Sequence, residues 1–500
     1  MNEQTTNKVI PLMLFKYFVF FIAGACIFTA FVAGENDREV LVGIFCAACL
    51  IIVSIPMFVQ KRVDLFEPLT FLVLLVTIGI PMKIIYVYWF GRHDQHVIDH
   101  VLLQKKPADF LYGSIIVSTA LFMLVLGYLL RFPRTTVELL YFPRVKDING
   151  RRLQFVLLIF FVISMIGFAG FAAKGGISLS SLTSLSQKRF GSFREEGAER
   201  MHNVLYLFMR MAGFSKFIVY FGLVWLIHRK KSFFSYTGLL VFIAALQTIT
   251  LGFAINSRAG VALLLLDCCV LCYFLMRQFD ARLIFGAGLI GIVLMMVMLA
   301  ARSKLVDESA ETPLAGLVKK TLCGRQFMDI AKISHIIDGV PRKMEYRNGE
   351  MLYNWLAGPV PTKYWPDKPM WASQGVKLNQ KIFNYKGTVS GCPPGIMGEL
   401  YWNFGLPGLL IGMFLLGIIY RQMYSVFHPN RHSPAAILIY TMVLTRFFLF
   451  TIGNDLGTGI VKSGLDLIPT YMTFMFVGMV SADDPFVDRS YEGLEPVGSL

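Results

Sequence analysis

The sequence predicts an all-α membrane protein with about twelve transmembrane helices. Of its 500 residues, 55% are hydrophobic and 16% are charged, and the mean hydropathy is +0.60. A soluble domain is about 45–50% apolar and about 25% charged. The apolar residues also recur in runs of about 20, the length that a helix needs to cross about 30 Å of hydrocarbon. This pattern excludes a soluble enzyme, a disordered chain and a disulfide scaffold.

Twelve apolar runs meet the length criterion. They cover, in chain order, residues 11–33, 40–59, 68–90, 109–130, 153–173, 204–227, 236–255, 260–276, 283–301, 405–421, 435–452 and 464–480. We expect the first run to be a retained helix, because Phe31-Val32-Ala33 lacks the small-x-small pattern of a signal-peptide cleavage site. We therefore expect one integral membrane domain over residues 1–500, with a tail at 481–500.

The distribution of positive charge predicts the orientation. Loops on the same side as the N-terminus carry the larger share of Lys and Arg, for example Lys61-Arg62, residues 131–152 and Arg229-Lys230-Lys231. Because cytoplasmic loops carry the excess of Lys and Arg, both termini are expected in the cytoplasm. The net charge of +15 then reflects membrane topology, and no nucleic-acid partner is expected.

Two loops on the opposite side are large. One covers residues 174–203 and is rich in Ser, Gly and Arg. The other covers residues 302–404, between the ninth and tenth spans, and contains the amphipathic segments Leu314–Ile337 and Met351–Leu356. A loop of this length is usually functional. No glycine-rich nucleotide-binding loop occurs, so chemistry is expected outside the cell and without ATP.

Cysteine usage agrees with this sidedness. Six of the eight cysteines fall in predicted spans, where they act as small apolar residues. The other two, Cys323 and Cys392, both belong to the 302–404 loop. An oxidising exterior would permit a disulfide between them. Two unpaired thiols are the alternative.

Ionisable residues inside apolar spans are costly and therefore point to function. Lys83, Arg210, Asp267 and Arg446 each lie about seven residues from the outer end of a helix, which is about 10 Å deep. Such a layer, with three cations and one carboxylate, suits an anion such as a pyrophosphate. The alternative is a structural network in which Asp267 pairs with Arg210 or Arg446. Lys216 lies deeper and has no assigned role.

The external loops add further cations. Arg258 lies in a short turn that opens the eighth span, where a guanidinium and the helix N-terminus would together form a phosphate site. Arg189, Arg325 and Arg347 lie in the two large loops. The alternative for each arginine is a solvated surface charge.

A histidine cluster after the third span suggests a metal site at first sight. His93, His96 and His100, with Asp94 and Asp99, have a spacing that could bind zinc. No Cys or Glu completes a known metalloenzyme pattern. We therefore predict a solvated loop and no metal.

The run Gly398-Glu399-Leu400-Tyr401-Trp402-Asn403-Phe404-Gly405 precedes the tenth span. Together with the proline-rich segment Pro359–Pro369 and the Ser257-Arg258 turn, it resembles bacterial oligosaccharide repeat-unit polymerases, the Wzy-type polymerases of O-antigen and exopolysaccharide. Arg347 and Gly358 also fit the Arg-x10-Gly spacing of that family. The likeness covers topology over most of the chain and motifs mainly in 256–260 and 347–405.

This resemblance implies a GT-C-type, metal-independent and cofactor-free glycosyltransferase of the bacterial inner membrane. Such an enzyme joins undecaprenyl-pyrophosphate-linked oligosaccharide units on the periplasmic face and releases undecaprenyl pyrophosphate. Its implied partners are the lipid-linked substrate, membrane lipids, a chain-length regulator and a flippase. The alternatives are an O-antigen ligase and a transporter of lipid-linked oligosaccharides.

The reaction would need cations at the leaving group and a base at the acceptor hydroxyl. The candidate cations are Arg189, Arg258, Arg325 and Arg347, with Arg210 and Arg446 beneath them. Glu399, at the outer mouth of the tenth span, is the candidate base, and His335 is the second candidate. Asp329 and Asp455 are further rivals. The alternative for Glu399 is a helix-start carboxylate stabilised by the helix dipole.

Overall fold

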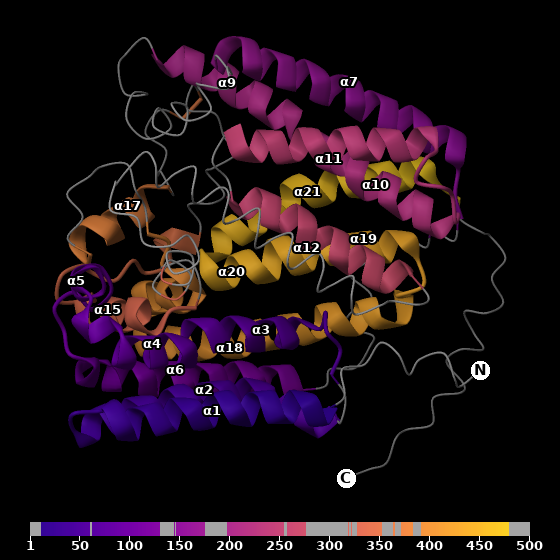
Figure 1. Ribbon diagram of the computed structural model, residues 1–500. Helices are drawn as coiled ribbons and strands as arrows, with labels where there is room; N and C mark the ends of the chain where they lie inside the picture. Colours follow the sequence, from indigo (N-terminus) through magenta and orange to yellow (C-terminus); the bar gives the residue numbers. More distant parts are fainter. Residues whose placement is uncertain are drawn as a thin grey trace.

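The computed structural model describes residues 12–60, 63–130, 145, 147–175, 198–254, 258–276, 319, 322, 328–352, 364–365, 372–383 and 392–479. These residues form helices that lie side by side in an elongated bundle (Figure 1). Their only strands are β1 (Asp147–Ile148) and β2 (Gly478–Met479), which pair antiparallel. The prediction of an all-α protein is confirmed for this part of the chain.

The N-terminal helices are α1 (Leu12–Ala33), α2 (Asp37–Gln60), α3 (Pro68–Gly79), α4 (Pro81–Trp89), α5 (Gln95–Val97), α6 (Leu111–Leu129) and α7 (Gly150–Gly175). They are followed by α9 (Ala198–Ala212), α10 (Ser215–His228), α11 (Tyr236–Ala254), α12 (Arg258–Leu275), α15 (Ile330–Gly339), α17 (Ala372–Lys381), α18 (Gly395–Asn430), α19 (Pro434–Met442), α20 (Leu449–Gly453) and α21 (Leu456–Val477). Two 3-10 turns (Gly91–His93 and Pro107–Phe110) and two π-helical turns (Ile98–Leu102 and Val443–Phe448) complete the helical structure of these residues.

Within the described residues, nine helical segments are long and apolar enough to cross a membrane. They correspond to the first seven predicted spans and to the tenth and eleventh. The eighth span is represented by a shorter apolar helix, Gly260–Leu275, and most of the twelfth falls within α21, which is not among the nine. The ninth, at 283–301, lies outside the described residues. The chain is therefore a multi-pass membrane protein.

Several predicted spans are not continuous helices. The span 68–90 breaks between α3 and α4 at Ile80, because Pro81 disfavours helical backbone in the preceding residue. The tenth span begins ten residues earlier than predicted and breaks at Gly405, whose φ is +65°. The eleventh contains the π-helical turn Val443–Phe448 between α19 and α20. Proline and glycine thus divide helices that hydropathy alone predicts as uniform.

Contacts between distant segments define two ends of the bundle. At one end β1 pairs with β2, and the Ser433 hydroxyl donates to the Val145 carbonyl. At the other end, α5, α15 and α17 lie together (Figure 1). We call this second end the loop end, formed by residues 90–110, 328–352, 392–404 and 453–456.

Close approach of small residues holds α6 and α18 together. A Cβ atom added to Gly127 on α6 would lie 2.0 Å from the carbonyl oxygen of Phe414, and one added to Gly417 on α18 would lie 2.0 Å from that of Leu124. Glycine therefore lets the two backbones touch. This is the usual way in which membrane helices associate without a hydrophobic driving force between them.

Candidate functional site

The 302–404 loop contributes α15, which is buried in the loop end rather than exposed to water. Asp329 caps the helix and accepts hydrogen bonds from the backbone N–H groups of Ala331 and Lys332 at 2.9 and 3.3 Å. A Cβ on Gly113 of α6 would lie 2.0 Å from the Ser334 hydroxyl, and one on Gly398 of α18 would lie 2.6 Å from Ile336. The loop helix therefore closes the end of the bundle between α6 and α18.

The break between α3 and α4 receives the start of this loop segment. A Cβ on Gly79 would lie 1.9 Å from the carbonyl oxygen of Met328, so the two backbones touch. The Lys83 ammonium lies 2.7 Å from the Asp329 carboxylate, and both side chains are only 1–2% exposed. Lys83, which we expected to share a layer with Asp267, thus pairs with the loop instead.

His335, on α15, lies in an apolar box formed by the rings of Phe110 and Phe383. Its Nε2 donates to the Val101 carbonyl at 2.9 Å, and Phe110 and Phe383 pack edge-on with ring centroids 5.4 and 5.9 Å away. Burial lowers the pKa of His335 to about 4, although the hydrogen bond to Val101 opposes this shift. A neutral imidazole with its Nε2 proton committed to a carbonyl ties α15 to residues 98–102. This geometry favours Glu399 over His335 as a base.

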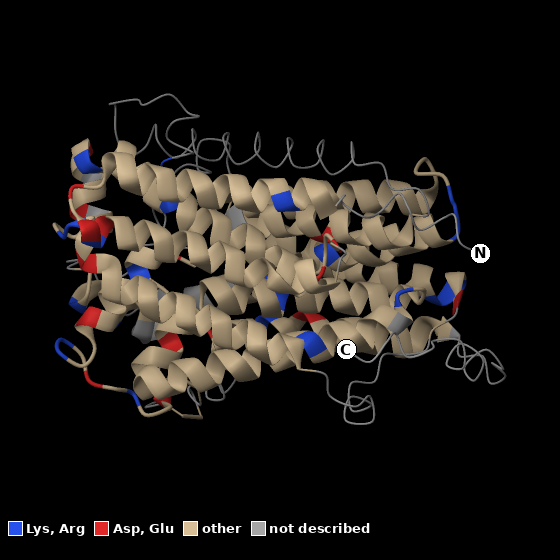
Figure 2. Cartoon of the chain, turned by 90° about the horizontal axis from the view of Figure 1, so that it is seen from below, with Lys and Arg blue, Asp and Glu red and all other residues tan. Residues whose placement is uncertain are grey.

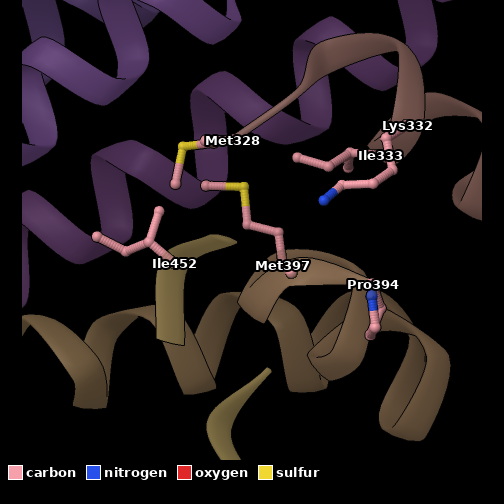
Figure 3. Close-up of a pocket in the computed structure, with 7 residues that line it drawn as sticks. Met328, Lys332, Ile333, Pro394, Met397 and Ile452 are labelled. Carbon is pink, nitrogen blue, oxygen red and sulfur yellow. The ribbon is translucent and has the colours of Figure 1, made fainter. Parts of the chain in front are cut away.

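Polar contacts converge on the turn between α20 and α21, residues 453–456. The Lys332 ammonium, which is 1% exposed, donates to the carbonyls of Pro393 at 3.2 Å and Gly453 at 3.5 Å. The Gly395 N–H donates to the backbone carbonyl of Asn454 at 2.5 Å. Figure 3 shows the Lys332 side chain extending into a narrow recess beside Met397. The cation thus neutralises the carbonyl end of α20.

Glu399 holds the other side of the same turn. Its Oε2 accepts the Leu456 N–H at 2.6 Å, and the residue is 1% exposed. Asp455 caps α21 itself by accepting the Thr458 N–H at 2.6 Å. Glu399 is therefore a carboxylate at a helix N-terminus, but that helix is α21 and not its own α18.

The motif around Glu399 organises the loop end. The Trp402 indole N–H donates to the Glu345 carbonyl at 3.1 Å. The Asn403 side chain donates to the Glu399 carbonyl at 2.8 Å and accepts the Gly349 N–H at 3.1 Å. The positive φ of Gly405 then ends the first segment of α18. Asn403 thus bonds directly to the backbone of Glu399, and Trp402 and Asn403 together fix the loop backbone at Glu345 and Gly349 against α18.

Arg347 lies beside this motif. Its backbone N–H donates to the Trp402 carbonyl at 3.0 Å, and its guanidinium lies over the Trp402 ring, 5.4 Å from the centroid. Nη1 also pairs with Glu350 at 3.1 Å. Arg347 is therefore at the loop end, as expected, with one carboxylate competing for its charge.

The interior of the bundle holds a second polar cluster, centred on Arg446 in the π-helical turn. The Arg446 Nε donates to Asp466 at 2.8 Å, and Nη1 donates to Thr445 at 3.0 Å and to Asp267 at 3.5 Å. Nη2 donates to Asp267 at 2.7 Å and to the Tyr220 hydroxyl at 2.9 Å. All five N–H groups of the guanidinium thus have protein acceptors.

This cluster corrects the expected role of Arg446. Lys216 pairs with Asp466 at 2.5 Å, so two cations and two carboxylates neutralise one another. With no donor left over, Arg446 has no N–H to offer a pyrophosphate. The alternative in which Asp267 pairs with Arg446 describes this geometry, and the cluster joins α10, α12, α21 and the π-helical turn.

Asp466 and Tyr220 were not singled out in the sequence analysis. Asp466 lies only two residues inside the predicted span 464–480, and these bounds place it at a helix end. Because α21 begins at Leu456, Asp466 is ten residues, or about 15 Å, from the start of its helix. The sequence signal for Asp466 was a carboxylate near a lysine within an apolar run. Nothing in the sequence distinguishes Tyr220 from the other tyrosines.

The structure describes some of the remaining candidate residues and not others. Figure 2 shows charged residues mainly at the two ends of the bundle, with a few inside it. Arg210 lies on α9 and is exposed, and Arg258 is the first residue of α12, as expected for a turn that opens a helix. The Arg258 side chain, Arg189, Arg325 and Cys323 lie outside the described residues, and with them the predicted disulfide to the buried Cys392.

The histidine segment shows no metal-binding arrangement in the part of the chain that the structure describes. There, no group of three His, Cys, Asp or Glu side chains could hold an ion. Asp94 instead pairs with Lys319 at 2.6 Å. The side chains of His96 and His100 lie outside the described residues.

Comparison with known proteins does not place the chain in a family. No family model matches it, and neither a curated protein nor a solved structure is significantly similar.

Proposed function

We propose that this protein is a polymerase of undecaprenyl-pyrophosphate-linked oligosaccharide repeat units. It would be a GT-C-type glycosyltransferase of the bacterial inner membrane, with both termini in the cytoplasm and the loop end facing the periplasm. It would need neither a metal nor a cofactor.

One observation carries the proposal. Glu399 is a buried carboxylate at the loop end, bonded to the start of α21 and carried by α18, which packs against the loop helix α15. A lipid-linked substrate would bring its diphosphate to the membrane surface at such a position. Its sugars would extend toward the loops.

The proposed reaction transfers the growing glycan to the incoming unit. Glu399 takes the proton from the acceptor hydroxyl, whose oxygen forms a bond to the anomeric carbon of the growing chain. The bond between that carbon and the diphosphate oxygen breaks, and undecaprenyl pyrophosphate leaves with the electron pair. Cations in a water-poor site stabilise the charge that develops on this leaving group.

The proposed leaving-group cations no longer include Arg446. Arg189, Arg258, Arg325, Arg347 and Arg210 remain candidates by sequence. Of these, Arg347 stands closest in the chain to the motif that positions Glu399, and Arg258 opens α12. The substrate, a chain-length regulator and a flippase are the proposed partners.

Transport of the same lipid-linked sugars is the second candidate. Broken helices at membrane depth are typical of transporters, and the breaks at Ile80, at Gly405 and in the π-helical turn Val443–Phe448 fit that pattern. A ligase that moves finished glycan to a lipid A core would share the chemistry of the polymerase.

Product analysis separates the three functions. The purified protein in liposomes receives the lipid-linked repeat unit, with or without a lipid A core acceptor. A polymerase yields longer glycans on the lipid diphosphate and releases one undecaprenyl pyrophosphate per joined unit. A ligase yields product only with the core acceptor, and a transporter moves the substrate without changing it. Either of the last two results would refute the proposal.

A further inference from the structure

A buried lysine connects the loop helix α15 to the turn that bonds to Glu399. Lys332, on α15, is 1% exposed, and its ammonium donates to the carbonyls of Pro393 at 3.2 Å and Gly453 at 3.5 Å. Pro393 lies two residues before the start of α18, and Gly453 is the last residue of α20. One cation thus ties together the loop helix, the start of α18 and the turn between α20 and α21.

These three segments meet closely at a glycine. Gly395 has a φ of +72°, and a Cβ at this position would lie 3.1 Å from the Ile452 carbonyl oxygen and 3.5 Å from the Lys332 Nζ. Figure 3 shows Lys332, Pro394 and Ile452, one from each segment, around the same narrow recess. A change at Lys332 therefore acts directly on the turn formed by residues 453–456.

This turn ends in the donor that orients the Glu399 carboxylate. Leu456 is the first residue of α21, so its N–H has no acceptor within that helix. It donates instead to the Glu399 Oε2 at 2.6 Å. The turn sets the direction of this N–H, and Lys332 holds the turn at Gly453, three residues earlier. Catalytic groups tolerate little displacement, since a shift of about 1 Å can lower a rate about 100-fold.

We propose that Lys332 is a positioning residue, which fixes the 453–456 turn so that the Leu456 N–H orients the Glu399 carboxylate toward the acceptor hydroxyl. The proposal rests on the proposed function, because it adds a residue to the same reaction. Lys332 itself neither touches substrate nor transfers a proton. Its loss should therefore lower kcat and leave the KM for the lipid-linked unit nearly unchanged. A residue that only stabilises the fold would leave the kcat of the folded molecules unchanged.

Two variants break the link at different points. Lys332→Met removes the ammonium and keeps a long side chain. Leu456→Pro removes the N–H that bonds to Glu399, and proline is well tolerated at the first position of a helix. The preceding residue, Asp455, already has the extended backbone that a following proline favours, with φ −165° and ψ 163°. The matched control is Lys343→Met, at an exposed lysine of the same loop segment.

The first measurement is the kcat and KM for joining two lipid-linked units, scaled to the amount of folded protein. We expect Lys332→Met and Leu456→Pro each to lower kcat about tenfold or more, and Lys343→Met to match the wild type. The double variant should be no slower than the slower single variant, because both changes remove the same constraint on the carboxylate. If Lys332→Met does not fold, Lys332→Gln takes its place in the same comparison.

Two kinetic results would overturn the proposal. One is a kcat of Lys332→Met equal to that of the wild type. The other is a pair of losses that multiply in the double variant, because Lys332 would then act independently of the Leu456 N–H.

Hydrogen exchange tests the same link without requiring catalysis. Amides at the start of α21 should exchange faster in Lys332→Met than in the wild type or Lys343→Met, because the turn loses its anchor. Equal exchange in all three would overturn the proposal. Failure of the proposed function looks different. A protein whose amides respond in this way but that never lengthens a glycan would refute the polymerase and leave the link between Lys332 and Glu399 in place.

Discussion

Single residues in the bundle divide into those that hold helices together and those that remain available to a ligand. Arg446 and Asp267 belong to the first group, because each is bonded on several sides within a nearly closed cluster. Glu399 combines both properties, since only its Oε2 is bonded to the start of α21. This difference predicts different outcomes for their substitution.

Replacing Arg446 by Met should destabilise the protein strongly. The variant leaves Asp267 and Asp466 buried near each other without their shared cation, and breaking such a pair costs about 3–5 kcal/mol. Denaturant unfolding in mixed micelles measures the change, with Lys231→Met as the exposed control. Unchanged stability combined with lost diphosphate binding would instead return Arg446 to the substrate site.

Replacing Glu399 by Gln should separate catalysis from folding. The amide oxygen can still accept the Leu456 N–H, so the unfolding temperature should stay near that of the wild type. A general base contributes about 10²–10⁴-fold, and glycan elongation should fall by that factor. Elongation at the wild-type rate would exclude Glu399 as the base.

His335 should make the protein sensitive to acid. Its pKa is about 6.5 in the unfolded chain and falls to about 4 in the folded protein, so the unfolded state binds more protons between these values. The stability is complete above pH 6.5 and is lost as the pH falls toward 4, by at most about 3 kcal/mol.

The variant His335→Phe tests this pH dependence, because Phe suits the apolar box of Phe110 and Phe383. The unfolding free energies of the wild type and the variant are measured from pH 7 to pH 4.5. The wild type should lose stability relative to the variant as the pH falls. A difference that does not change with pH would contradict the buried, neutral imidazole.

The sequence predicts which residues are unusual at this scale, but not their partners. A charge in an apolar run is visible in the sequence, and Lys83, Asp267 and Arg446 were found in this way. Their pairing depends on which helices pack together: Asp267 and Arg446 are 179 positions apart, and Lys83 pairs with a loop residue. Asp466 was missed because the start of its helix was placed too late.

At the scale of elements, the loop helix α15 docks where a span is broken. The junction depends on Gly79, which lets the Met328 backbone touch the end of α3, and on the ion pair between Lys83 and Asp329. Helix length and apolar character follow from hydropathy. The breaks do not, because they depend on the local effects of Pro81, Gly405 and the π-helical turn.

The variant Gly79→Ala should release α15 from this break. Its Cβ would lie 1.9 Å from the Met328 carbonyl oxygen, and forcing the backbones apart costs about 1–3 kcal/mol. Hydrogen exchange of the α15 amides should then become faster. The matched control is Gly24→Ala on α1, where a Cβ meets nothing within 4 Å. Equal exchange in both variants would mean that α15 is held by other contacts.

At the scale of the whole molecule, composition and hydropathy were sufficient to predict a multi-pass helical bundle, and nine of the twelve predicted spans correspond to described helices that are long and apolar enough to cross a membrane. The arrangement of the bundle was not predictable, because it depends on close approaches such as that of Gly127 and Gly417. The burial of α15 was also unexpected. An amphipathic pattern predicts one apolar face, whereas nearly every residue of α15 is buried where the helix packs between α6 and α18.

The central claim is that this chain lengthens lipid-linked glycans by itself at the loop end. Its most direct test is incubation of the purified protein with an undecaprenyl-pyrophosphate-linked repeat unit, in the presence of a metal chelator and without nucleotide, followed by separation of the products by size. We predict a ladder of glycans that differ by one repeat unit, present with Lys231→Gln and absent with Glu399→Gln. Substrate that remains a single unit, or a ladder that appears only after divalent metal or nucleotide is added, would contradict the claim.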